Sequence, residues 1–285
     1  MPDPIPRPIP RAREAGEFEH RFTIWAELQR NFGSARSYPY AWRLPELARR
    51  EGADARARAD LALAQTLFAM GRFGDVLAAL PDAGRPVASH LAAQALHLRA
   101  CCHALRDETE AALECHRAAL AAFADPLEAA RARVDFLFWA DRPEAAPAAA
   151  GEYQARAGAA ARPEHVAWAR LFADWSEAGR AAPARTHAAL AWLRTRGAAE
   201  AALAESCHAE ARFHEAPATA LAWLDVALEQ ADRYGWHHIK TRLLWHKALA
   251  LEAAGQLGEA GRFGQLARET ARRQGAWRDL SRMAV

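Results

Sequence analysis

The segment LEAAGQLGEAGRFGQLA, residues 251–267, contains two helical patterns separated by a turn at Gly255. Glycine adopts left-handed backbone angles at little cost, so it commonly ends a helix. Five earlier segments have the same pattern, and their turn positions are Gly71, Asp107, Asp141, Gly179 and Glu215. The steps between successive turns are 36, 34, 38, 36 and 40 residues. This period is typical of a helical solenoid, in which each unit buries its apolar face against the next.

The recurrence predicts pairs of helices joined by short turns. The expected first helices of the pairs cover 56–70, 88–105, 127–140, 163–178, 199–214 and 237–253. The expected second helices cover 74–81, 108–122, 143–157, 182–195, 216–233 and 257–274. Alanine, the best helix former, is abundant, and no run of alternating apolar and polar residues indicates a strand. We therefore expect an all-α fold.

The chain divides into three predicted parts. Prolines at every second position between residues 2 and 10 remove backbone donors and favour an extended chain, which predicts a flexible tail. The alternative is that this tail docks as a strap along the body. The parts are the tail at 1–16, an N-terminal helical cap or divergent repeat at 17–55, and the repeats with a C-terminal capping helix at 56–285.

The N-terminal cap is expected to contain two helices. The first begins near Glu17, and Gly33 and Pro39 are expected to end it, because glycine and proline interrupt helices. The second is expected from about Ala41 to Arg50. Such a cap would cover the open face of the first regular repeat.

The repeats resemble the tetratricopeptide repeat family. In that family, a small residue on the second helix lets the two helices of a pair approach closely. The matching positions here are Val76, Ala112, Ala146, Ala184, Ala220 and Ala260. The resemblance covers roughly residues 56–275. It implies a right-handed α-solenoid of antiparallel helix pairs, with about six repeats, whose first helices line a concave face.

The resemblance also places one set of side chains on this concave face. They are His97, Cys101, Arg131, Asp135, Phe138, Glu205, Arg212, Arg242, Trp245 and Leu249. Arginines there would bind acidic groups of a partner through charge-assisted hydrogen bonds, and an exposed Trp245 would act as an anchor. The alternative is that the arginines pair with neighbouring acids such as Asp135 in an unoccupied groove.

One cluster combines residue types that bind metals. It consists of His97, Cys101, Cys102, His103, Cys115 and His116. His97 and Cys101 share a helix face, whereas Cys115 and His116 belong to the paired helix and are expected to face away. We therefore expect buried free thiols and ordinary packing, with no metal site. The sequence contains no phosphate-binding glycine loop and no nucleophile motif, so neither a cofactor nor a catalytic residue is predicted.

Charge and hydropathy limit the classes of partner. The net charge is +2 with acids and bases interspersed, so a nucleic-acid partner is not expected. Without a long apolar run or a secretory signal, we expect a cytoplasmic protein with no membrane partner. The leading hypothesis is a non-catalytic scaffold that binds a partner peptide or helix in the concave groove, with homodimerisation left open. The alternative is a ligand-sensing module that regulates a transcription or signalling partner, and a closed central cavity would favour it.

Overall fold

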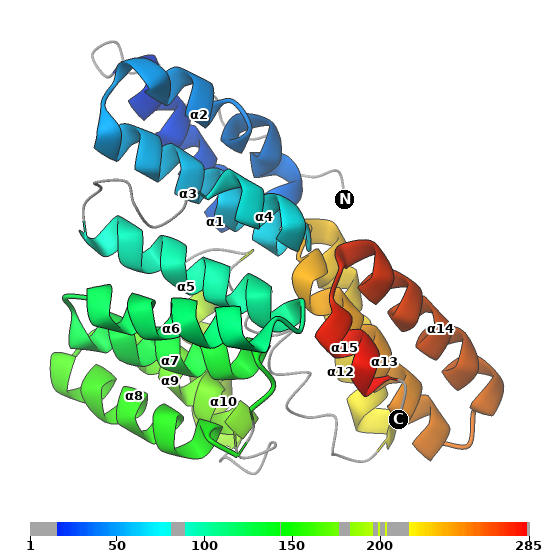
Figure 1. Cartoon of the computed structure of the whole chain (residues 1–285). Coiled ribbons are helices and arrows are strands. Elements are labelled where there is room, and N and C mark those ends of the chain that lie inside the picture. Colours follow the sequence, from blue (N-terminus) through cyan, green and yellow to red (C-terminus); the bar gives the residue numbers. More distant parts are fainter. Residues whose placement is uncertain are drawn as a thin grey trace.

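The computed structural model describes residues 16–80, 89–142, 144–176, 183–195, 199, 203 and 217–283 (Figure 1). All regular structure in this part of the chain is helical, which confirms the all-α class. The helices are α1 (Glu17–Ala41), α2 (Leu44–Leu47), η1 (Ala48–Arg50), α3 (Ala53–Ala69), α4 (Phe73–Ala79), α5 (Ser89–Leu105), α6 (Thr109–Ala122), α7 (Pro126–Trp139), α8 (Ala146–Ala160), α9 (Pro163–Ser176), α10 (Pro183–Arg194), α12 (Pro217–Tyr234), α13 (His237–Ala253), α14 (Leu257–Gln274) and α15 (Trp277–Arg282).

The predicted helix bounds agree closely with these elements. From α3 onward, the expected and observed ends of the described helices differ by at most three residues. The predicted helix at 199–214 and the tail at 1–16 lie outside the described residues, apart from Gly16, Ala199 and Leu203. None of the described helices has the length and apolar character needed to span a bilayer.

The described turns between paired helices share one backbone conformation. Their φ angles are left-handed: 71° at Gly71, 63° at Asp107, 53° at Asp141 and 75° at Gly255. In each turn the next amide donates a hydrogen bond of 2.9–3.0 Å to the carbonyl five residues earlier, which closes the last helical turn. Aspartate tolerates this conformation better than most residues, so the same turn forms without glycine. Gly179 and Glu215 lie outside the described residues.

Small residues lie where the helices touch. The predicted contact residues whose side chains are described are all buried: Val76, Ala112, Ala146, Ala220 and Ala260. Consecutive helices pack in chain order, α3 with α4, α5 with α6 and α7 with α8. The first helices also contact one another in succession, from α3 through α5 and α7 to α9. Close approach at small side chains allows this packing.

The N-terminal cap differs from the prediction. Gly33, with φ 70° and ψ −170°, interrupts α1 as expected, but the chain is helical again from Ser34 to Ala41, with Pro39 inside this helical piece. The second cap helix therefore begins earlier than predicted. Tertiary packing overrides the local signal, because Ser34 and Ser37 are buried and both bond to the side chain of Gln29.

The C-terminal helices return to the N-terminal ones (Figure 1). Helix α12 contacts α1, α13 contacts α3, and α15 contacts α5. We call these contacts the closing interface. At its α1–α12 contact, a Cβ at Gly33 would lie 2.1 Å from the Tyr234 carbonyl oxygen, and one at Gly235 would lie 2.8 Å from the Ala35 amide nitrogen. Only glycine fits at either position.

Three C-terminal side chains, four residues apart in sequence, each contact the turn of a different helix pair. Gln274 lies against Gly71, Arg278 is 3.1 Å from Asp107, and Arg282 is 3.1 Å from Asp141. The aspartates therefore combine two roles, since they adopt the left-handed turn conformation and accept an arginine. The closing interface thus contacts three successive turns.

Replacing Gly33 by alanine is expected to destabilise the protein much more than replacing Gly255. Both changes place a Cβ at a left-handed φ, which costs about 1–2 kcal/mol. Only at Gly33 does the new Cβ collide with Tyr234, whereas nothing lies within 4 Å at Gly255. In urea unfolding we expect Gly33→Ala to lose at least about 2 kcal/mol more than Gly255→Ala. Equal losses would contradict the packing of α1 against α12.

Candidate functional site

A cavity of about 460 Å³ lies among the first helices of the pairs. Its lining side chains come from α1, α3, α5, α7, α9 and α13, together with Phe123, Leu203 and Trp236. Because α13 packs against α3, residues from the beginning and the end of the chain face the same space. The volume falls within the range of small-molecule sites, roughly 300–1,000 Å³.

Aromatic side chains form the apolar part of the cavity wall. Six of them are buried: Phe68, Phe138, Trp139, Trp168, Phe172 and Trp236. A seventh, Phe123, is half-buried. The rings of Phe68, Trp139 and His238 contact one another at centroid distances of 5.2–5.4 Å. Such ring pairs prefer these offset and edge-on arrangements. This wall suits an apolar or aromatic part of a ligand.

His238 lies where the two ends of the chain meet. Its ring contacts Phe68 of α3 and Trp139 of α7. Its Nδ1 lies 3.0 Å from the carbonyl oxygen of Ala69, so Nδ1 carries the proton and donates the hydrogen bond. Burial lowers the pKa of His238 to about 4, so its imidazole is neutral at pH 7.

Polar side chains form the other part of the wall. They include Gln29, Gln65, Gln94, His97, Glu128, Arg131 and Asp135. The side chains of Glu128, Arg131 and Asp135 are 32%, 37% and 34% exposed, whereas the aromatic wall is buried. Water therefore reaches the charged side of the cavity, and the cavity is amphipathic.

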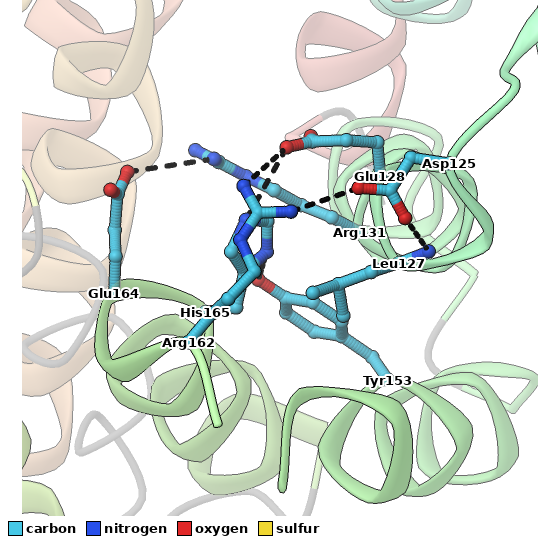
Figure 2. Close-up of polar contacts among 8 residues, drawn as sticks. All are labelled: Asp125, Leu127, Glu128, Arg131, Tyr153, Arg162, Glu164 and His165. Atoms are coloured by element: carbon cyan, nitrogen blue, oxygen red, sulfur yellow. Dashed lines mark hydrogen bonds and ion pairs between the residues drawn. The ribbon is translucent and has the colours of Figure 1, made fainter. Parts of the chain in front are cut away.

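The carboxylate of Glu128 makes polar contacts with two residues at the start of α9 (Figure 2). Its carboxylate lies 3.5 Å from the guanidinium of Arg162 and 3.3 Å from Nε2 of His165. Nδ1 of His165 lies 3.0 Å from the hydroxyl of buried Tyr153. Arg162 also pairs with Asp125, the residue that caps α7, at 2.8 Å. The carboxylate of Glu128 is therefore positioned by Arg162 and His165.

Arg131 projects among acidic side chains and forms a long ion pair with Glu164 (Figure 2). Among the described residues, its nearest carboxylate oxygen belongs to Glu164, at 4.0 Å, which is longer than a hydrogen bond. Asp135, one helical turn away, is instead 2.9 Å from Nε2 of His97. The guanidinium also lies 5.9 Å from the ring centroid of Trp168. Arg131 therefore joins the charged side of the cavity to its aromatic wall.

The cavity brings together five of the predicted partner-binding residues. They are His97, Cys101, Arg131, Asp135 and Phe138. All five come from α5 and α7. Glu205 and Arg212 lie outside the described residues.

Three further predicted residues lie away from the cavity. Arg242 is 3% exposed, pairs with Asp279 at 3.5 Å and lies 4.7 Å from the ring centroid of Phe138. Trp245 and Leu249 line a separate hollow between α13 and α14. The reason is packing of α13 on its neighbours, because Arg242 contacts Asp279 and Phe138, whereas Trp245 and Leu249 face α14.

The other residues of the metal-type cluster point elsewhere. His103 contacts Glu108 at 2.5 Å, and His116 stacks on Phe136 with ring centroids 4.0 Å apart. Cys102 is buried and is not among the residues that line the cavity. Within the described residues, Cys101, Cys102 and Cys115 are free thiols.

Sequence reasoning missed several lining residues. Gln29 belongs to the cap, and Trp236 and His238 belong to the start of α13. Nothing in the local pattern brings these segments together, because they meet only through the closing interface. Trp168 occupies a first helix, α9, but is not among the residues predicted on the concave face.

Comparison with known proteins gives no family for this chain. No protein-family model matches it, and no curated protein is significantly similar to it. The function is therefore argued from the side chains that line the cavity.

Acid is expected to destabilise the fold through His238. Its folded pKa of about 4 lies below the usual value of 6.5, so the unfolded chain takes up the proton first and stability falls as the pH drops through this interval. From about pH 7 to about pH 5 this histidine alone contributes a loss of about 2 kcal/mol. Urea unfolding at both pH values should show that the free energy of unfolding falls less between them in His238→Phe than in wild type. The exposed His90→Phe is the control, and equal pH dependence in both variants would contradict the assignment.

Proposed function

We propose that this chain is a non-catalytic regulatory module that encloses a small ligand in its central cavity. The observation that carries the proposal is one cavity, lined from both ends of the chain, with an aromatic wall opposite charged side chains. This combination favours the ligand-sensing hypothesis over the peptide scaffold. The buried free thiols Cys101 and Cys102 fit a reducing compartment such as the cytoplasm.

We propose that the helix pairs form one turn of a right-handed superhelix of tetratricopeptide type. Three observations support this arrangement: the shared turn conformation, the small residues at helix contacts, and the first helices that line the cavity. After one superhelical turn, the last pair meets the first, and the concave surface becomes a partly enclosed space. Closure would thus convert a binding groove into a ligand site.

The size of the cavity favours a small ligand over a partner helix. An α-helix with its side chains is about 10 Å across, so 460 Å³ corresponds to roughly 6 Å of helix, or about one turn. A small molecule or the end of a short peptide fits this volume. A helix lying along the whole array does not.

Arg131 sets the charge of the proposed ligand. Glu128 is engaged by Arg162 and His165, and Asp135 is engaged by His97. Arg131 itself has a long ion pair with Glu164, at 4.0 Å, which a bidentate contact with a ligand carboxylate could replace. With the aromatic wall beside it, we infer an amphipathic anion in which a carboxylate is attached to an apolar or aromatic body.

A ligand in this cavity contacts both sides of the closing interface. Gln29 and Phe68 belong to the N-terminal side, and Trp236 and His238 belong to the C-terminal side. Binding would therefore favour the arrangement in which the two ends of the chain are in contact over one in which they are apart. The size of this shift equals the difference in the ligand's binding free energy between the two arrangements. A transcription or signalling partner that recognises only one arrangement would respond to the ligand.

Matched carboxylates and carboxamides test this proposal. We expect members of a panel of aromatic carboxylates and tripeptides with free C-termini to bind, measured by tryptophan fluorescence, and their amides to bind more weakly. Arg131→Ala should weaken carboxylate binding about 10- to 100-fold, because a hydrogen bond to a charged group contributes about 1.5–3 kcal/mol.

The control variant is Arg133→Ala, on the same helix, because Arg133 pairs with Glu152 and does not line the cavity. Its carboxylate affinity should equal that of wild type. Equal weakening in the two variants, or a panel with no preference for carboxylates over amides, would contradict the role of Arg131.

A further inference from the structure

Three side chains with metal-binding atoms lie together on the cavity wall. His97 and Cys101 are one helical turn apart on α5, and Asp135 projects from α7. Their ligand atoms all lie within 4.8 Å of one another. Nε2 of His97 is 2.9 Å from Oδ2 of Asp135 and 3.8 Å from Sγ of Cys101. The third residue comes from a different helix, so the sequence pattern did not include it.

These distances suit a single tetrahedral ion. Nitrogen, oxygen and sulfur atoms bound to zinc at 2.0–2.3 Å lie about 3.3–3.6 Å from one another. The observed 2.9 Å and 3.8 Å fall on either side of that range, and the third distance, between Asp135 and Cys101, is at most 4.8 Å, so side-chain rotations would bring the three atoms to one ion. All three residues line the central cavity, which leaves a fourth position open towards it.

We propose that His97, Cys101 and Asp135 bind one Zn²⁺ ion whose fourth coordination position faces the central cavity. The inference goes beyond the proposed function and does not depend on it, because the three ligands belong to the protein. A sulfur, an imidazole and a carboxylate form a donor set that suits zinc. The open position would hold water or a donor atom of a molecule in the cavity.

Proton balance accompanies the binding of the ion. The Cys101 thiol releases its proton to solvent and coordinates as thiolate, and the thiolate and the Asp135 carboxylate together balance the charge of Zn²⁺. The proton between Nε2 of His97 and Asp135 moves to Nδ1, which frees the Nε2 lone pair for the metal.

The surroundings of the three ligands explain why the thiol depends on a metal. Cys101 is buried, and this burial, with the charge of Asp135, raises its pKa well above the usual value. Without an ion, the thiol stays protonated at neutral pH. The positive charge of Arg131, one turn before Asp135 on α7, opposes the binding of a cation. The negative charge of Glu128, one turn before Arg131, favours it. A bound divalent ion would be the largest local charge and would stabilise the thiolate.

Cobalt substitution tests the site directly. The full chain is freed of metal with a chelator and titrated with Co²⁺. We expect a thiolate-to-cobalt charge-transfer band and the visible bands of tetrahedral Co²⁺, saturating at one ion per chain. Cys101→Ala should lack the charge-transfer band, and Cys102→Ala should keep it. Cys102 is the matched control because it is equally buried on the same helix but does not line the cavity.

Zinc affinity gives a second readout that leaves the thiol in place. In competition with a chromogenic chelator, Asp135→Asn and His97→Ala should each bind Zn²⁺ at least about tenfold more weakly, or 1.4 kcal/mol. Circular dichroism checks that each variant is folded. If Cys101→Ala does not fold, the zinc affinity of Asp135→Asn tests the site instead, because this substitution preserves side-chain volume.

Several outcomes would overturn the inference. One is a wild-type chain that gives no charge-transfer band with Co²⁺. Another is a band that survives in Cys101→Ala, because it would assign coordination to a different thiol. Unchanged zinc affinity in Asp135→Asn would show that Asp135 does not bind the ion, and it would also overturn the inference.

Discussion

The closing interface is the constraint on which the rest of the structure depends. Without it, the cavity would lack the side contributed by Trp236 and His238, and the aromatic wall would be open to water. Two glycines permit the approach of α1 and α12, because no larger residue fits at Gly33 or Gly235. The imidazole of His238 then fills the space between Phe68 and Trp139. A few contacts between distant parts of the chain thus determine whether there is an enclosed site.

Charge also contributes to this interface, and it does so at a cost. Arg242 and Asp279 are both buried and lie 3.5 Å apart, so each loses its hydration on folding. A buried pair of this kind adds little net stability, but the loss of one partner leaves an unpaired buried charge and costs about 3–5 kcal/mol. Arg242 recovers part of its desolvation cost over the ring of Phe138. The pair is therefore better understood as fixing how α13 and α15 dock than as strengthening the fold.

Local signals predicted the helices well and the contacts between distant helices poorly. Gly71 and Gly255 end their helices because of their own backbone freedom, so the sequence alone locates both turns. His97 and Arg131, which the spacing along the first helices placed on one surface, both line the cavity. By contrast, the helical piece after Gly33 contains buried serines, and Trp245 lies against α14, the helix that follows α13. Packing between the chain ends leaves no trace in a local pattern.

Three successive turns are contacted by one C-terminal row of side chains, Gln274, Arg278 and Arg282. These contacts limit how this architecture can change in evolution. An open repeat array can gain or lose a unit, because each repeat touches only its immediate neighbours. Here, a duplicated or deleted unit would shift each arginine away from its aspartate and separate Gly33 from Tyr234. Selection should therefore hold the number of units constant in relatives that retain these pairs.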